Sequence, residues 1–258
     1  MSHHGSPCWY ELTTTPGALD AAGAFYGKVL GWTAQDAGMP DFTYHLASAD
    51  DQMVAGLMEM PADVAGMPPM WMLYFSVEDA DAAVAQMQAA GAQLHRPVMP
   101  IPGTGRFAIL ADPQGAAFGI LEPLPGGIGT AFQPPKQGHG NWNELMTTEP
   151  AAAMAFYSQV FHWQTSRSVD MGAMGNYELI ARQGADIGGM MRAMPDGTGA
   201  AQPHWLPYFG VDSAAAAAER IIAAGGRVTN GPMEVPGPAY VVTATDPQGA
   251  AFAVVGAK

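Results

Sequence analysis

The chain has 258 residues, of which 48% are hydrophobic and 13% are charged, a balance that excludes an intrinsically disordered protein. Its 10 Lys and Arg residues against 23 Asp and Glu residues give a formal net charge of -13, which excludes a nucleic-acid partner because phosphates would be repelled. No apolar run reaches the roughly 20 residues that span a bilayer, and no secretory signal is visible, so we expect a cytoplasmic protein without a membrane partner.

The first quarter of the chain predicts a strand, a helix and three further strands. Residues 8–14 alternate between two faces, as in a strand, and place Trp9 and Glu11 on the same face. Apolar residues then recur at helical spacing over residues 16–30, and Gly31 ends the helix. Short strands separated by polar or Gly/Pro turns are predicted at residues 33–37, 42–48 and 52–60.

The same order of elements recurs three more times. The second group comprises a strand at 71–77, a helix at 80–90 and strands at 93–98, 106–111 and 116–122. The third has a strand at 141–147, a helix at 150–161 and strands up to residue 191. The fourth has a strand at 205–211, a helix at 213–224 and strands at 227–232, 240–245 and 250–255. The sequence therefore predicts an α+β fold of four βαβββ modules.

An exact repeat shows how these modules are organised. The segment DPQGAAF stands at residues 112–118 and again at 246–252, and the offset of 246 − 112 = 134 also carries Trp71 onto Trp205. A long fixed period indicates a duplicated unit. We expect one domain at residues 5–124, a Pro- and Gly-rich linker at 125–138 that packs little, and a second domain at 139–257.

Two motifs carry a resemblance to a known superfamily. The helix signature FYGKVLGW at residues 25–32 is echoed as FYSQVFHW at 156–163, and both halves carry a DPQG turn. Together they resemble the vicinal oxygen chelate superfamily, which includes glyoxalase I, bleomycin-resistance proteins and extradiol dioxygenases. The resemblance implies two tandem glyoxalase-like domains with cupped mixed sheets, each holding a metal ion or a small ligand.

The resemblance also indicates where metal ligands would stand. The first position falls on Glu11 and Glu144. The second falls on Met72 and Leu206, and the closing-strand position falls on Gly119 and Ala253, none of which offers a metal ligand. A catalytic divalent cation needs about three protein ligands, so we predict no metal site, no cofactor and no assigned catalytic residue. Glu122 lies three residues beyond Gly119 and is expected on the opposite face of its strand.

The remaining candidates are ligand-binding residues. A carboxylate beside an indole suits a ligand hydrogen bond or proton transfer, and retained aromatic groups suit stacking; the predicted set is Glu11, Glu144, Trp9, Trp142, Tyr44, Tyr177, Trp71 and Trp205. A structural alternative stays open, in which the Glu residues are satisfied by a backbone amide or a Tyr hydroxyl and the aromatics belong to the core. His45 against Glu178, and Arg106 against Tyr240, are positions where the halves have diverged.

The leading hypothesis is a metal-independent small-molecule binding protein whose cups take an aromatic or cationic ligand. The alternative is a metal-dependent lyase, isomerase or dioxygenase of the same superfamily, so enzymatic activity stays undecided. Because duplication supplies internally the partner that such modules otherwise find in a second chain, we expect a monomer or weak homodimer.

Overall fold

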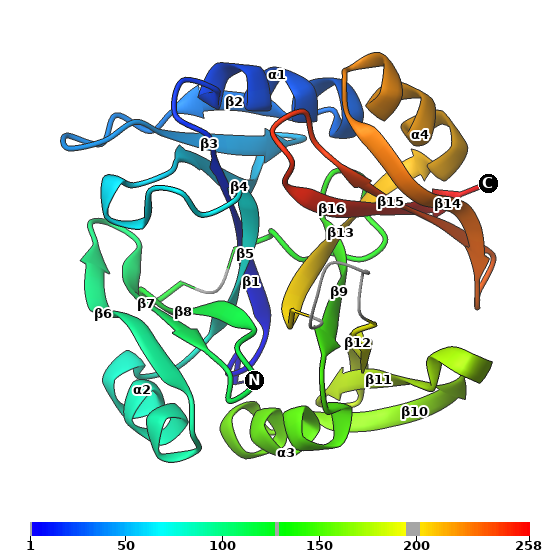
Figure 1. The fold of residues 1–258 in the computed structure, drawn as a ribbon. Helices are drawn as coiled ribbons and strands as arrows, with labels where there is room; N and C mark the ends of the chain where they lie inside the picture. The colour runs from blue at the N-terminus through cyan, green and yellow to red at the C-terminus, as the bar shows by residue number, and fades with distance from the viewer. Residues whose placement is uncertain (1, 127–128, 195–201) are drawn as a thin grey trace. The chain divides into compact units, whose positions relative to one another are not determined.

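The computed structural model describes residues 2–126, 129–194 and 202–258, and its elements run four times as strand, helix and three strands (Figure 1). Module 1 comprises β1 (Pro7–Thr14), α1 (Leu19–Leu30), β2 (Thr33–Asp36), β3 (Tyr44–Ala49) and β4 (Gln52–Glu59). Module 2 comprises β5 (Met70–Ser76), α2 (Ala80–Ala89), β6 (Gln93–Ile101), β7 (Gly105–Ala111) and β8 (Ala117–Pro123).

Module 3 comprises β9 (Gly140–Thr147), α3 (Pro150–Phe161), β10 (Gln164–Asp170), β11 (Asn176–Arg182) and β12 (Ala185–Arg192). Module 4 comprises β13 (His204–Ser213), α4 (Ala214–Ala223), β14 (Arg227–Val235), β15 (Ala239–Thr245) and β16 (Ala251–Ala257). Short 3₁₀ turns lie at Ala62–Val64 and Gly172–Met174. The predicted α+β fold with four βαβββ modules is confirmed.

The strands form two mixed eight-stranded sheets, in the orders β2-β3-β4-β1-β5-β8-β7-β6 and β10-β11-β12-β9-β13-β16-β15-β14. Within each module the first strand pairs in parallel with the last, as β1 does with β4 and β9 with β12. The second and third strands continue outwards in antiparallel pairs. Each sheet therefore draws on two consecutive modules, and the fold matches two tandem glyoxalase-like domains.

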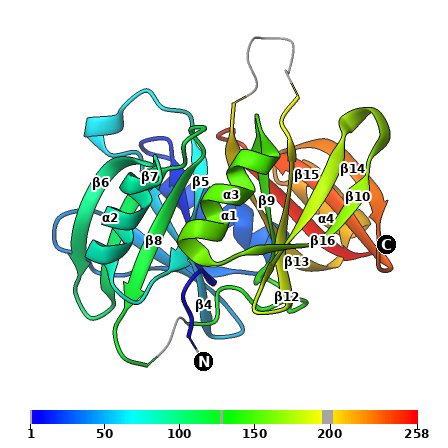
Figure 2. The same cartoon turned by 90° about the horizontal axis from the view of Figure 1, so that it is seen from below.

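The compact units of the structure group the modules differently from the two sheets. One compact unit, here the first unit, contains the residues up to Cys8 together with Leu73–Gly129 and Trp142–Trp205, which are essentially modules 2 and 3. The second unit contains Trp9–Met72, Thr130–Asn141 and Leu206–Lys258, which are essentially modules 1 and 4. Helices α2 and α3 lie side by side in the first unit, and α1 and α4 do so in the second (Figures 1 and 2).

The helix boundaries follow from local chemistry. Helix α3 occupies the predicted residues, with Pro150 in its first turn, where a missing N–H costs nothing. Helix α1 starts at Leu19 and not at residue 16, because Thr15 accepts a 3.1 Å hydrogen bond from the Ala18 amide and closes a turn first. That turn holds the two residues that module 1 has in excess of module 3.

The core of each unit is aromatic. In the second unit, Tyr26 lies 5.2 Å from Trp71 between ring centroids, and Phe209 lies 5.1 Å from Trp32, with edge-to-face geometry in both pairs. In the first unit, Tyr157 lies 5.5 Å from Trp205 in the same geometry. Such pairs add to the hydrophobic stabilisation of burial. Both aromatic cores draw side chains from both halves of the sequence, since Phe75 also packs edge-to-face against Trp205 in the first unit.

The segment between the halves packs more closely than its composition indicates. Ala131 and Gly138 are buried, and the Gly138 carbonyl accepts a 2.7 Å hydrogen bond from the Trp32 indole. The expectation of a loosely packed linker is wrong for these residues, because a buried indole N–H requires an acceptor and this backbone supplies it. The domain boundaries predicted from the repeat stay a prediction. Among the described residues, no helix is long and apolar enough to cross a membrane.

Candidate functional site: two tryptophan-tyrosine-glutamate faces

A tyrosine of the helix signature is held between an indole and a carboxylate inside each unit. In the second unit, Trp71 Nε1 donates to Tyr26 Oη at 2.9 Å, and Tyr26 Oη donates to Asp246 Oδ2 at 3.1 Å. The pKa of Tyr26 is raised, first because burial disfavours the phenolate and second because Asp246 repels it. The hydroxyl therefore stays a donor to the carboxylate.

The first unit repeats this arrangement with other modules. Trp205 Nε1 donates to Tyr157 Oη at 3.1 Å, and Tyr157 Oη donates to Asp112 Oδ2 at 3.1 Å. Asp112 opens the predicted DPQG hairpin turn, where its Oδ1 accepts the amides of Gln114 and Ala116 at 2.9 and 3.0 Å. The two sequence signatures thus bind each other, and they do so in the core.

This placement decides how Trp71 and Trp205 are interpreted. Both were predicted to contact a ligand, but they are only 4% and 5% exposed and already donate their N–H groups. Met72 stands at the opening-strand position of the family, and successive strand residues point to opposite faces, so Trp71 has to point to the helix side. We leave both tryptophans out of the candidate site.

The same succession of hydrogen bonds, from an indole through a tyrosine to a carboxylate and here called a relay, also occurs at partly exposed positions. In module 1, Trp9 Nε1 donates to Tyr44 Oη at 3.1 Å, and Tyr44 Oη donates to Glu11 Oε2 at 2.9 Å. All three side chains are partly exposed. They come from β1 and β3, which flank β4, so the relay spans three adjacent strands. We call this set the module 1 relay face.

Module 3 carries the same arrangement. Trp142 Nε1 donates to Tyr177 Oη at 2.8 Å, and Tyr177 Oη donates to Glu144 Oε2 at 3.0 Å. These side chains are also partly exposed, and they define the module 3 relay face. The structure therefore brings together six of the eight predicted site residues, as two separate groups of three.

Glycines make room for the tyrosine rings on the intervening strand. Glu11 pairs with Gly56, and a Cβ at Gly56 would lie 1.8 Å from the Tyr44 hydroxyl oxygen. Glu144 pairs with Gly189, where a Cβ would lie 2.2 Å from Tyr177 Cε1. Sequence reasoning missed this role of the glycines. Their signal was their recurrence at the same offset as the two glutamates, since 189 − 56 and 144 − 11 are both 133.

The electrostatics of the relay faces fix the direction of their hydrogen bonds. The pKa of Tyr44 is raised, mainly by burial and then by the charge of Glu11, and the pKa of Tyr177 is raised by burial and Glu144. Both phenols stay protonated and donate to the carboxylates. The structural alternative required a hydrogen-bond partner for each Glu, and the tyrosine hydroxyl is one such partner. The ligand-binding role of the glutamates stays a prediction.

The residues at the family's metal positions do not fit a catalytic divalent cation. Glu11 is engaged by Tyr44, and Met72 supplies no hard ligand. At Gly119, a Cβ would lie 2.2 Å from Tyr74 Cδ1, so an aromatic ring fills the space that a ligand side chain would need. Among the described residues, no three His, Cys, Asp or Glu side chains are grouped to hold a metal ion.

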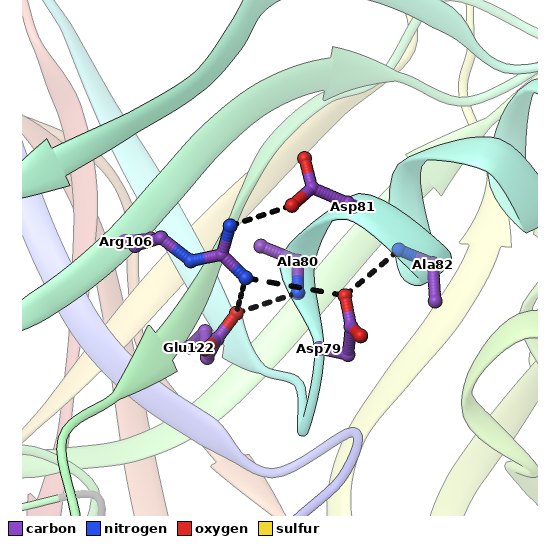
Figure 3. Close-up of polar contacts among 6 residues, drawn as sticks. All are labelled: Asp79, Ala80, Asp81, Ala82, Arg106 and Glu122. Atoms are coloured by element: carbon purple, nitrogen blue, oxygen red, sulfur yellow. Dashed lines mark hydrogen bonds and ion pairs between the residues drawn. The ribbon is translucent and has the colours of Figure 1, made fainter.

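Glu122 lies on the helix side of its sheet, as predicted, and serves the start of α2 (Figure 3). Its Oε2 accepts the Ala80 amide at 2.8 Å and Arg106 Nη2 at 2.5 Å. Arg106 Nη1 donates to Asp81 at 2.5 Å. Arg106, a position where the halves diverge, thus has a structural partner in Glu122.

Two hollows lie away from the relay faces. One, of about 450 Å³, is lined by N-terminal residues and the end of β8, including His3, Glu78 and Glu122. The other, of about 280 Å³, lies along α1 and includes Asp20, Trp32 and His45. Neither lining includes a relay residue.

Comparisons with known proteins agree with this architecture. Residues 12–120 and 139–254 match the model of the Glyoxalase/Bleomycin resistance protein/Dioxygenase superfamily. A protein of Mycobacterium tuberculosis named "Putative glyoxylase CFP32" is 35% identical over 97% of this chain and 94% of its own length. The anthracycline biosynthesis protein DnrV of Streptomyces peucetius is 31% identical over 97% of this chain and 93% of its own length.

A solved structure shows the same fold at low sequence identity. The Mn(II)-bound glyoxalase from Novosphingobium aromaticivorans superimposes with a TM-score of 0.69 at 15% identity, covering 99% of this chain and 83% of that one. At this identity the likeness concerns the fold alone. The family match over most of the chain, together with full-length relatives above 30% identity, establishes that the chain belongs to the Glyoxalase/Bleomycin resistance protein/Dioxygenase superfamily.

Proposed function

We propose that this protein binds a planar aromatic small molecule, preferably one carrying a positive charge, without the help of a metal ion. The observation that carries the proposal is the tryptophan-tyrosine-glutamate relay, which occurs at partly exposed positions in both halves with matching hydrogen bonds. Each relay presents an indole, a phenol and a carboxylate together. Rings stack on aromatic side chains, and a carboxylate attracts a cation.

The contrast with the buried relays supports a binding role. Tyr26 and Tyr157 join helix to turn in the core, where a hydrogen-bonded tyrosine has a structural purpose. Tyr44 and Tyr177 make equivalent bonds outside these cores, between side chains that are partly exposed. Holding two aromatic rings and a carboxylate rigidly at a partly exposed surface lowers the entropy that ordering them on binding would otherwise cost.

Charge and relatives point to the same ligand class. The formal net charge of -13 favours cations over anions at the protein surface. One relative is named for the biosynthesis of anthracyclines, which are compounds with a fused planar ring system. An anthracycline is therefore a suitable first probe.

The test is a titration with daunorubicin, an anthracycline with an amine, and with its aglycone, which lacks the amine. We expect both compounds to quench tryptophan fluorescence and to bind equally well with and without a chelator. The double variant Glu11→Gln/Glu144→Gln should weaken daunorubicin binding by about tenfold to 150-fold, because a charge-assisted contact contributes about 1.5–3 kcal/mol, and should change aglycone binding little.

A charge-matched control separates local from overall electrostatics. Glu219→Gln/Glu234→Gln removes the same two charges from exposed positions on α4 and β14 and should leave both affinities unchanged. Melting temperatures of all variants are measured alongside. Failure of the wild-type protein to bind either compound would overturn the proposal, as would binding that appears only with added metal. A large loss of stability with unaltered affinity would show that the two glutamates have a structural role.

A further inference from the structure

The two relay faces share their hydrogen bonds but differ at the residue two positions before the tyrosine. In module 1 that residue is Phe42, whose ring centroid lies 6.0 Å from that of Tyr44 with an interplanar angle of 84°. Phe42 remains 47% exposed. In module 3 the residue two positions before Tyr177 is Gly175.

The backbone of module 3 excludes an aromatic ring at this position. Gly175 has φ 81° and ψ −155°, a combination that is essentially restricted to glycine because a Cβ would clash with the backbone. It ends the 3₁₀ turn Gly172–Met174, and its amide bonds to the Gly172 carbonyl at 3.0 Å. We call the segment just before each relay tyrosine the rim of its relay face. A single substitution cannot give the module 3 rim an aromatic ring at this position, because the backbone of the turn would also have to change.

No structural constraint comparable with that at Gly175 explains why the Phe42 ring of module 1 is exposed. An edge-to-face contact with Tyr44 orients the Phe42 ring, yet nearly half of its surface stays in water. Phe42 lies in the bend that precedes β3, and its edge-to-face contact holds its ring beside that of Tyr44. The ring therefore extends the module 1 relay face outwards. A planar ligand lying there would bury apolar surface of Phe42 that folding leaves exposed.

The module 3 rim offers a different surface. Its exposed apolar side chains are Met171 and Met174, at 36% and 46%. Thioether chains are flexible and adapt to many shapes, whereas a phenyl ring held against a tyrosine presents one orientation. The first rim is therefore the more selective for flat rings.

We infer that the module 1 relay face is the site that selects planar aromatic ligands, that Phe42 is its specificity-determining residue, and that the chain binds one such ligand. The inference rests on the proposed function and assigns it to one of two similar faces. The module 3 relay face binds the same class at least tenfold more weakly, because it has only the rings of Trp142 and Tyr177 and no counterpart of Phe42.

The test uses daunorubicin and the full-length protein in calorimetric titrations that report the number of sites. We expect one site per chain. Phe42→Ala and Phe42→Leu should each weaken binding about tenfold, because both lose the aromatic ring. The leucine variant keeps apolar bulk and so tests whether the ring itself is needed. Met174→Ala, which truncates an apolar side chain of similar exposure on the other rim, should leave affinity and site number unchanged. None of the three variants should lower the melting temperature appreciably, since both positions are exposed.

The single-glutamate variants then assign the face. Glu11→Gln should weaken binding and Glu144→Gln should not. Two equal sites per chain would overturn the inference while leaving the proposed function intact, and so would loss of affinity in Glu144→Gln and Met174→Ala with Phe42→Ala unaffected. If the wild-type protein binds no daunorubicin, the proposed function fails and this inference fails with it.

Discussion

At the scale of single residues, one arrangement recurs in four places among the described residues: a tyrosine accepts from an indole and donates to a carboxylate. Two of these tyrosines lie in the core and two at partly exposed positions. The shared face of Trp9 and Glu11 could be predicted from the sequence, because side chains alternate between the two faces of a strand. The glycine beneath each ring could not, because its role depends on which strand pairs beside the glutamate.

Gly56 provides a direct test of the relay geometry. In Gly56→Ala the new methyl group would meet the Tyr44 hydroxyl at 1.8 Å, so the ring has to move and its hydrogen bond to Glu11 should break. We expect a loss of stability of about 1–3 kcal/mol, together with weaker ligand binding. Thermal melting and the daunorubicin titration measure both effects.

Gly23→Ala is the matched control, because its Cβ would meet only Ala34 Cβ at 3.4 Å and the residue lies in helix α1. There the added methyl group should be neutral or stabilising, by up to about 1 kcal/mol. If Gly56→Ala behaved in the same way, the Tyr44 ring would not lie over Gly56 in solution.

At the scale of elements, the helix signature and the DPQG turn have to be understood together. The sequence predicted both, and the residues of α3 were predicted correctly because Pro150 and an apolar period mark them clearly. Strand β6 runs to Ile101, beyond the predicted residue 98, because it lies at a sheet edge, where Pro97 and Pro100 are tolerated. That the tyrosine of a helix would bind the aspartate of a turn from another module could not be predicted, since no local pattern encodes the partner.

These tyrosines predict how stability depends on alkaline pH. The pKa values of Tyr26 and Tyr157 are raised above the ordinary value of 10.0 by burial and by the neighbouring aspartates, and those of Tyr44 and Tyr177 are also raised. Above pH 10.0 the unfolded chain releases these protons while the folded chain retains them, so stability should fall as pH rises through and beyond that value.

The measurement combines alkaline melting curves with the ultraviolet absorbance of tyrosinate. Part of the absorbance from the 8 tyrosines should appear only when the protein unfolds. The variant Tyr44→Phe/Tyr177→Phe should show a shallower loss of stability above pH 10.0 than the wild-type protein. Reversible ionisation of all tyrosines in the folded protein would contradict the raised pKa values.

At the scale of the whole molecule, chain order and packing order differ. The exact repeat correctly predicted two similar halves, but it could not show that module 1 packs with module 4 and module 2 with module 3. Hydrophobic periodicity identifies the apolar face of each helix and is silent about which other helix covers it. The aromatic cores settle the pairing through contacts between residues far apart in sequence, such as Phe209 with Trp32.

This pairing predicts that neither half folds well alone. A fragment of residues 1–129 should expose the aromatic side chains that normally meet modules 3 and 4, and should lack a cooperative melting transition as a monomer. Co-expression with residues 130–258 should yield a soluble complex with native near-ultraviolet circular dichroism. Phe209→Ala in the second fragment should weaken assembly, because its ring lies 5.1 Å from Trp32 and 5.2 Å from Trp71. A monomeric first fragment with cooperative melting would contradict the prediction.

The nested pairing of modules also has a consequence during protein synthesis. Modules 2 and 3 are adjacent along the chain, so the first unit is complete once Trp205 has emerged from the ribosome. Module 1 emerges first of all but has to wait for module 4, which ends 258 − 205 = 53 residues later. At roughly 5–20 residues per second, the second unit is completed about 3–10 s after the first. Ribosome-bound chaperones would therefore be expected to meet the apolar side of module 1 more often than that of any later module.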